Sequence, residues 1–151
     1  MTRSWGTMVS NGRTSKWHAG GLLLLAIAVA ACGGERRSQN ALPPDEIQRA
    51  LPRIAAEAPA DVAGGKELFE LNCSSCHGPV ANGSDLGPPL VDIIYEPGHH
   101  ADVAFVLAVR NGVRAHHWRF GDMPPLPGVT EPMVQEIVGY VRWLQRQVGI
   151  E

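Results

Sequence analysis

Two cysteines and a histidine stand within five consecutive residues of this 151-residue chain, in the segment Cys73-Ser74-Ser75-Cys76-His77. This C-x-x-C-H spacing is the signature of covalent haem attachment of the c type. On one helical turn, two thiols three residues apart can reach both vinyl groups on one porphyrin edge, and the adjacent imidazole falls under the iron. The segment therefore predicts one covalent haem c, bound through Cys73 and Cys76 and ligated on the proximal side by His77.

Two other uses of paired cysteines compete with this interpretation. A thioredoxin-like redox pair would need a βαβ pattern around the motif, and the residue after its second cysteine would not be expected to be histidine. A zinc site would need a second Cys or His pair at finger spacing, whereas the chain offers the adjacent pairs His99-His100 and His116-His117. Haem attachment is the reading that the residues favour.

The N-terminal segment differs from the rest in charge. The chain has 13 Lys and Arg and 15 Asp and Glu, and every acidic residue follows Cys32. An apolar run of about 13 residues, 19–31, is too short to cross a hydrocarbon core of about 30 Å. Basic residues before a short apolar run predict a secretory signal over residues 1–31. Without it the formal charge is −5, from 10 basic and 15 acidic residues, which argues against a nucleic-acid partner.

The end of this run, Val29-Ala30-Ala31-Cys32, resembles the lipobox of bacterial lipoproteins, in which the cysteine is lipidated and the preceding peptide removed. The resemblance implies an exported protein of the cell envelope, held to a bacterial membrane through Cys32. The alternative is an ordinary signal peptide that is cut after Ala31 and leaves a free thiol.

Residues 32–60 are rich in glycine, proline and alanine, and Pro52 interrupts the one stretch that could form a helix. We therefore expect a flexible linker between the lipid anchor and a folded domain over residues 61–151.

The folded domain is expected to be all-α. Apolar residues recur at helical spacing over residues 61–73, 101–110 and from Thr130 onward, and a short turn is expected near residues 91–95. The second of these segments is apolar on most faces, which predicts burial against the haem. No stretch alternates apolar and polar residues in the manner of a strand.

With its motif in place, the segment from residue 61 to the C-terminus resembles the small bacterial class I cytochromes c. In that family a glycine and an aromatic residue precede the haem motif, and Gly65 and Phe69 stand eight and four residues before its first cysteine. The resemblance implies a small cytochrome c fold of three to five helices around the haem. Gly65 would let the C-terminal helix approach closely, and Phe69, Ile137 and Tyr140 would pack where the helices cross.

The sixth iron ligand is expected to be Met123, within Phe120-Gly121-Asp122-Met123-Pro124-Pro125. Members of the family place their axial methionine in such a Met-Pro loop, and a thioether ligand favours Fe(II) and raises the potential. Met133, His116 and His117 are the alternatives. Either histidine would give a haem of lower potential.

Another segment, Gly87-Pro88-Pro89-Leu90, resembles the family's Gly-Pro-x-Leu sequence after the haem motif. The resemblance implies that the Pro88 carbonyl accepts a hydrogen bond from the proximal imidazole and that Leu90 packs on the haem. The alternative is a plain loop of turn residues.

Two axial ligands leave no open position on the iron, so we expect an electron-transfer protein rather than an enzyme. Its partners would be redox proteins that donate and accept single electrons, with no small-molecule substrate. Three arginines, Arg110, Arg114 and Arg119, are either solvated, paired with a haem propionate, or part of a positive patch for an acidic partner.

Two other functions remain open from the sequence. The domain could be the haem c subunit of a larger dehydrogenase or oxidase complex. If Met123 is absent from the iron or easily displaced, the haem could instead serve a sensor or a peroxidase.

Overall fold

A computed structural model describes residues 40–151. The expected signal peptide and Cys32 lie outside the described residues. The helices are α1 (Pro44–Ala56), α2 (Ala60–Asn72), α3 (Ser74–His77), the 3₁₀ helix η1 (Ile93–Tyr95), α4 (Asp102–Asn111) and α5 (Glu131–Gln147). Between residues 40 and 151 there is no strand, only an isolated bridge between Val113 and Met123. The all-α prediction is confirmed.

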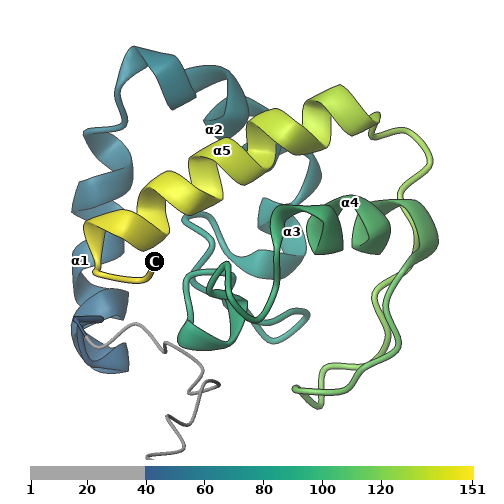
Figure 1. Ribbon diagram of the computed structural model, residues 1–151, viewed down its shortest axis with the longest axis horizontal. Coiled ribbons are helices and arrows are strands. Elements are labelled where there is room, and N and C mark those ends of the chain that lie inside the picture. The colour runs from purple at the N-terminus through teal and green to yellow at the C-terminus, as the bar shows by residue number, and fades with distance from the viewer. Residues whose placement is uncertain (1–39) are drawn as a thin grey trace, which may run out of the picture. The chain divides into compact units, whose positions relative to one another are not determined.

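The C-terminal helix α5 organises the domain. It runs diagonally across the view in Figure 1 and packs against α2, α4 and α1. Its buried side includes Tyr140, Val141 and Leu144, each fully buried. None of the helices within residues 40–151 is both long enough and apolar enough to span a bilayer.

Sequence periodicity located three of these helices well. The expected segments 61–73 and 101–110 correspond to α2 and α4, and the expected turn corresponds to η1. The apolar period from Thr130 onward corresponds to α5, and Thr130 occupies its N-cap position without making a side-chain capping hydrogen bond. A proline in the first turn suits this start, because the first amides of a helix have no internal partner.

The burial against the haem expected for α4 is wrong for Val103, which is 60% exposed and borders no cavity. The helix packs on α5 along one side, and Val109 is buried. Phe105, Leu107 and Ala108 border an open cavity, to which part of the 48% exposure of Leu107 belongs. An apolar helix wall therefore faces the cavity rather than closed protein core.

The expected flexible linker is also wrong over residues 44–56, which form α1. Ile47, Leu51 and Ala55 recur every four residues and are buried, so one stripe of the helix joins the main core. Pro52 lies inside the helix and removes one hydrogen bond. Burial of the stripe outweighs that loss, and the ordered domain begins well before residue 61.

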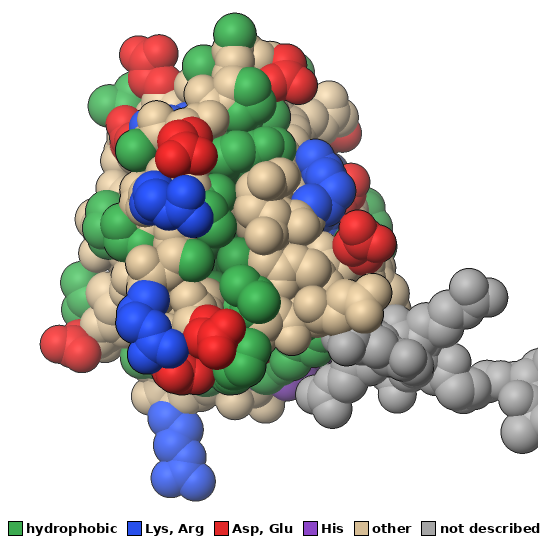
Figure 2. All heavy atoms as spheres, turned by 90° about the vertical axis from the view of Figure 1, so that its left-hand side faces the viewer, with side chains coloured by type: hydrophobic (Ala, Val, Ile, Leu, Met, Phe, Trp, Pro, Cys, Tyr) green, Lys and Arg blue, Asp and Glu red, His purple; other side chains and the backbone are tan. Residues whose placement is uncertain are grey.

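The exposed side of α1 carries ion pairs one helical turn apart. Arg49 pairs with Asp45 at 2.9 Å and Arg53 with Glu57 at 3.7 Å. Figure 2 shows the left-hand side of Figure 1, where basic and acidic side chains alternate with apolar ones and neither sign of charge predominates. Exposed pairs of this kind contribute little to stability.

Helices α2 and α5 approach each other closely at Gly65. A Cβ atom at this position would lie 2.1 Å from the backbone carbonyl oxygen of Glu136 and 3.2 Å from the Cβ of Tyr140. Beside it, the rings of Phe69 and Tyr140 pack with centroids 5.8 Å apart. Ile137 is buried in the same cluster. The packing that the resemblance implied for these four residues is therefore present.

Replacing Leu51 by alanine tests whether α1 belongs to the folded domain. Leu51 is fully buried, so its truncation should lower the free energy of unfolding by about 2–5 kcal/mol. The control is Arg53→Ala, whose side chain is 76% exposed and should change stability by less than about 0.5 kcal/mol. Denaturant unfolding of the haem-loaded protein measures both. Equal stability of the two variants would show that α1 does not pack in solution.

Replacing Gly65 by alanine tests the helix crossing. The added methyl group must displace the α5 backbone, so we expect a loss of about 1–3 kcal/mol in the free energy of unfolding. Gly139→Ala is the matched control, because it also adds a methyl group to a helix but meets no atom within 4 Å. Alanine favours a helix by about 1 kcal/mol over glycine, so this control should be neutral or stabilising. A Gly65 variant as stable as the control would contradict the proposed contact.

Candidate haem-binding site

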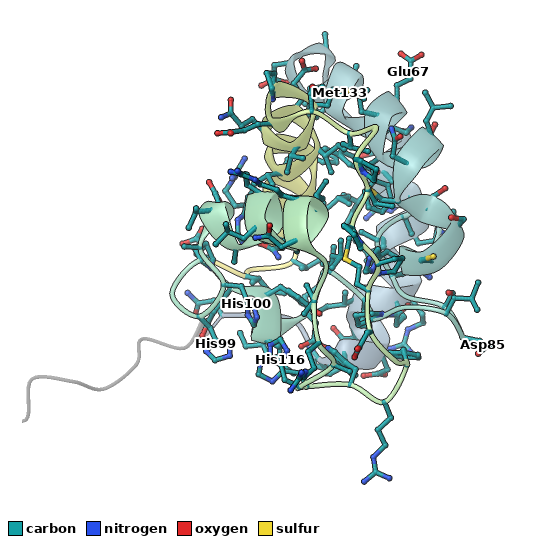
Figure 3. All side chains as sticks on the ribbon, turned by 90° about the vertical axis from the view of Figure 1, so that its right-hand side faces the viewer. Glu67, Asp85, His99, His100, His116 and Met133 are labelled. Atoms are coloured by element: carbon teal, nitrogen blue, oxygen red, sulfur yellow. The ribbon has the colours of Figure 1, made fainter. Side chains whose placement is uncertain are left out.

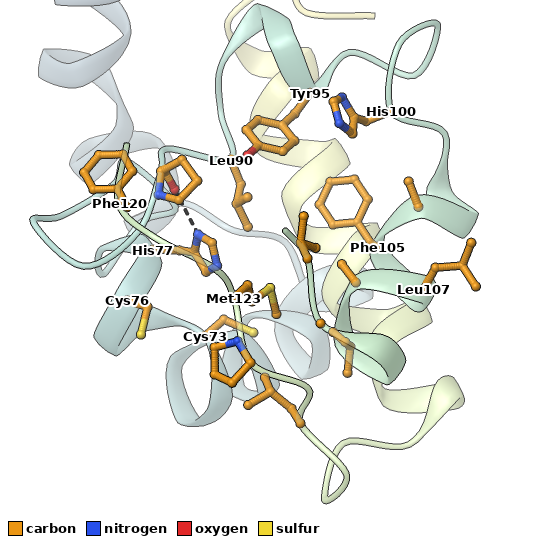
Figure 4. A pocket seen from close by; sticks show the side chains of 18 of the residues that line it. Cys73, Cys76, His77, Leu90, Tyr95, His100, Phe105, Leu107, Phe120 and Met123 are labelled. Atoms are coloured by element: carbon orange, nitrogen blue, oxygen red, sulfur yellow. Dashed lines mark hydrogen bonds between the residues drawn. The ribbon is translucent and has the colours of Figure 1, made fainter. Parts of the chain in front are cut away.

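One cavity of about 540 Å³ opens beside α3 and α4. This volume lies within the range of roughly 300–1,000 Å³ that is typical of small-molecule sites. All residues predicted to hold or contact the haem line it: Cys73, Cys76, His77, Pro88, Leu90 and Met123. Figure 4 shows the side chains of His77 and Met123 pointing into the cavity. The structure thus brings together residues up to 50 positions apart in the sequence.

The positions of the two cysteines are set by the crossing of α2 and α5. Cys73 ends α2, and its amide donates a 2.8 Å hydrogen bond to the carbonyl of Phe69. The single turn α3 then carries Cys76 and His77, and the His77 amide donates to the carbonyl of Cys73 at 2.9 Å. Both thiols and the imidazole therefore come from one turn of backbone fixed against α5 by α2.

The Cys73 thiol differs from the reactive thiols of a redox enzyme. Burial, together with a smaller contribution from the neighbouring Cys76, raises the pKa of Cys73 to about 11. Reactive cysteines in thioredoxin-like proteins have pKa values lowered below about 8.5. Both thiols are free of a disulfide. This environment disfavours a redox pair and suits cysteines that serve as attachment points.

His77 is oriented by a backbone carbonyl. Its Nδ1 lies 2.9 Å from the carbonyl oxygen of Pro88, the hydrogen bond that the resemblance implied (Figure 4). A carbonyl only accepts, so Nδ1 carries the proton and Nε2 keeps its lone pair, the arrangement usual for ligating imidazoles. Burial lowers the pKa of His77, against an opposing effect of this hydrogen bond, and so favours the neutral ring.

The loop that supplies Pro88 is tied back onto the haem motif. The Gly83 amide donates to the carbonyl of His77 at 2.7 Å, and the Leu90 amide donates to the carbonyl of Ala81 at 2.9 Å. A Cβ at Gly87 would lie 2.9 Å from the carbonyl oxygen of Cys76, so only glycine fits there without a shift. The segment is a loop of turn residues, and these contacts fix its backbone against the haem motif. Leu90 is 8% exposed and forms part of the wall.

Met123 is held at both backbone groups. Its amide and carbonyl exchange two hydrogen bonds with Val113, each 2.9 Å long. Gly112, just before this bridge, has φ of +73°, and a Cβ there would meet the Met123 carbonyl oxygen at 2.6 Å. Glycine is therefore required by both conformation and space. The methionine side chain is directed into the cavity from a fixed backbone.

The other candidates for the sixth ligand separate into two groups. His116 and His117 also line the cavity, whereas Met133 does not. Figure 3 shows Met133 at the start of α5, far from the labelled histidines. Of the four candidates, Met123, His116 and His117 have access to a group in the cavity.

Four histidines meet at the rim of the cavity, which the sequence analysis did not foresee. This histidine cluster consists of His99 and His100 before α4 and His116 and His117 after it, with ring centroids 4.3–6.0 Å apart in the contacting pairs. Burial, together with the neighbouring imidazoles, lowers the pKa values of His100 and His117. The sequence signal for this cluster is that a His-His pair stands on each side of α4, His99-His100 before it and His116-His117 after it.

The three arginines predicted near the Met123 loop lie outside the cavity lining. Arg110, Arg114 and Arg119 are exposed, and none of them lines the cavity. Solvation, pairing with a haem propionate and a positive patch for an acidic partner therefore all stay predictions for these residues.

The cavity matches the chemistry of a haem. Its walls are mainly apolar, through side chains such as Leu90, Phe105 and Val109. One end carries the two thiols, and the other end carries the polar groups of Tyr95 and His100 (Figure 4). A porphyrin has the same polarity, with vinyl groups on one edge and carboxylates on another. The donor set, an imidazole and a thioether, suits iron.

Comparison with known proteins agrees with this geometry. One curated relative is the cbb3-type cytochrome c oxidase subunit FixP of Sinorhizobium medicae (strain WSM419), 32% identical over 130 residues. The alignment covers 76% of this chain but only 42% of that relative. No solved structure matches the chain. The sequence model of the family described as cytochrome c matches residues 62–145, more than half of the chain. The protein therefore belongs to the cytochrome c family, and its cofactor is covalently bound haem c.

Proposed function

We propose that this cytochrome c carries single electrons between redox proteins of the cell envelope, with His77 and Met123 as the axial ligands of its haem iron. When bound, the haem supplies a one-electron Fe(III)/Fe(II) couple. The observation that carries the proposal is that one cavity gathers both cysteines of the motif with an oriented imidazole and a fixed thioether.

The chain's own contribution is to keep these ligands in place. The Pro88 carbonyl fixes the ring of His77, and the paired hydrogen bonds with Val113 fix the backbone of Met123. Ligands held by the fold move little when the charge at the site changes, so little reorganisation opposes the transfer of an electron. The same restraint excludes substrates from the iron.

The rim of the cavity provides a surface for redox partners. Leu107 and Phe120 line the cavity and are 48% and 40% exposed, so an apolar edge reaches the solvent. The exposed arginines Arg110 and Arg114 lie on the neighbouring segments. An apolar centre with basic residues beside it suits transient contact with an acidic partner, because opposite charges speed association and orient it.

We place the protein at a membrane, anchored through a lipidated Cys32. Two observations support this: the lipobox-like sequence before Cys32, and a relative that is a subunit of an oxidase. The described residues begin at residue 40, eight positions after Cys32, so the anchor would lie close to the fold in the sequence.

A second candidate function is that of a haem c subunit in a larger oxidase or dehydrogenase complex. The similarity to the FixP oxidase subunit favours it, although the chain spans less than half of that relative. The exposed Leu71 and Leu86, at 74% and 68%, are apolar side chains that a permanent partner could cover.

The axial ligation is tested by replacing Met123 with alanine. Loss of the thioether should remove its weak charge-transfer band in the ferric protein and lower the reduction potential by on the order of 100 mV, within the roughly 0.8 V range set by axial ligands. Met133→Ala, away from the cavity, is the matched control and should leave both unchanged. Optical redox titration measures both quantities. Survival of the band in the Met123 variant would assign the position to another residue.

Carbon monoxide distinguishes electron transfer from a sensor or peroxidase. The reduced wild-type protein should bind carbon monoxide slowly or not at all, because Met123 occupies the sixth position, whereas Met123→Ala should bind it rapidly. Rapid mixing with detection of the haem spectrum reports both rates. Rapid binding by the wild-type protein would favour a displaceable ligand and a sensor or peroxidase function.

The anchor is tested by replacing Cys32 with serine and following the protein after cell fractionation. Serine cannot accept the thioether-linked lipid, so the variant should move from the membrane to the soluble exported fraction. The wild-type protein from the same cells is the reference. A variant that stays at the membrane and co-purifies with other redox subunits would refute the lipid anchor and favour the complex.

A further inference from the structure

We propose that His99, His100 and His117 form a binding site for a divalent transition-metal ion of the Zn²⁺ type, at the rim of the haem cavity. The site uses neither of the proposed iron ligands, His77 and Met123, although His100 and His117 also line the haem cavity. It joins two segments that are 18 residues apart in sequence and lie on either side of α4.

The distances fit a metal site. One ring nitrogen from each of the three histidines lies within 4.8 Å of the others. The Nε2 atoms of His99 and His117 are 3.3 Å apart. Zn²⁺ binds imidazole nitrogen at about 2.0–2.1 Å in tetrahedral geometry, which places two such nitrogens about 3.3–3.4 Å from each other. The nitrogen of the third ring lies within 4.8 Å of the other two and must move closer to them to complete the set.

One ring of the site, that of His100, is oriented from behind by a backbone carbonyl. His100 Nδ1 lies 2.7 Å from the carbonyl oxygen of Ile94, which only accepts, so His100 keeps the lone pair on Nε2. Metal-ligating histidines usually donate their other nitrogen in this way. His116 Nδ1 similarly lies 2.9 Å from the carbonyl of Arg114, and its ring packs against that of His117 at 4.3 Å.

The backbone behind His100 is itself fixed by a buried arginine. Arg142 of α5 donates to the carbonyl of His100 and, at 2.5 Å, to the carbonyl of Tyr95. It also pairs with Asp102 at 2.8 Å. One histidine of the site is thus anchored to the core, whereas His99 and His117 are exposed and accessible to an ion from solvent.

The composition of the site selects the class of ion. Three neutral imidazoles suit Zn²⁺ and similar borderline ions better than Ca²⁺ or Mg²⁺, which prefer oxygen. Three histidines leave a fourth tetrahedral position for water or another ligand. Figure 3 shows His99, His100 and His116 grouped on one side of the molecule, with Asp85 on the other.

A bound ion would connect the segment before α4 to the loop that carries Met123. His117 lies six residues before Met123, within the loop that the bridge between Val113 and Met123 closes. The ion would therefore restrain this loop beside the cavity without touching the iron.

The test is calorimetric titration of the oxidised, haem-loaded protein with Zn²⁺ alone. We expect one Zn²⁺ ion to bind per chain. The affinity for Zn²⁺ should fall by about 100-fold or more in His99→Ala and in His117→Ala, because losing a ligand weakens binding at least as much as losing the group that orients the ligand. Asp85→Asn, an exposed carboxylate outside the cluster, is the control and should bind as tightly as the wild type. Zn²⁺ should also raise the unfolding temperature of the wild type and of this control, but not of the histidine variants.

Two results would overturn the proposal. One is that the wild-type protein binds Zn²⁺ no more tightly than the His99→Ala, His117→Ala double variant. The other is a changed axial-ligand spectrum in His117→Ala without added metal, which would make His117 a haem ligand. The spectrum of Met123→Ala tests the electron-transfer proposal separately, so failure of one proposal is distinguishable from failure of the other.

Discussion

The rest of the domain depends on the contact of the α2 and α5 backbones at Gly65. The carbonyl of Glu136 occupies the space that any other residue's side chain would need. Eight residues after Gly65, Cys73 caps the C-terminus of α2, so the helix crossing determines where the haem motif begins. The apolar packing of Phe69 and Tyr140 next to the contact fixes the direction of α2 as well as its position. Helix packing therefore determines where the cofactor is attached, independently of the contacts that the cofactor itself makes.

The rest of the cavity is made by loops, and hydrogen bonds to main-chain atoms give those loops their shape. The loop after α3 is tied to His77 and Ala81 through amide and carbonyl groups. The loop after α4 is closed by the bridge between Val113 and Met123. Backbone restraints of this kind demand few particular side chains, which explains why the loops contain many glycines and prolines. The specific side chains are concentrated where they face the cavity.

Much of the fold and cavity was predictable because its signals are local. The haem motif, the Gly65 and Phe69 spacing, and the apolar periods of α2 and α5 each lie within one segment. Helix α1 was missed because Pro52 argues against a helix, and the burial of Leu51 on α5 that outweighs this effect is a tertiary contact. The apolar faces of α4 predicted its place beside the haem, and Phe105 and Leu107 line the cavity, but they did not predict that Val103 faces solvent.

The histidine cluster shows the same limit. Each dipeptide alone resembles a solvated surface pair, and only the return of the chain after α4 brings His117 to His99. Residues that cooperate across a helix have no fixed spacing for a motif to record. Such sites follow from the fold and not from the local sequence.

The bridge between Val113 and Met123 has a consequence for how this protein can change. Both ends of the loop between them are fastened to each other, so added residues would bulge outward and leave the methionine where it is. Lengthening a flexible loop is also cheap, at about 0.6 kcal/mol for each doubling. Evolution or an engineer can therefore alter the outer surface of this loop, where partners would dock, while the ligand beneath it keeps its place.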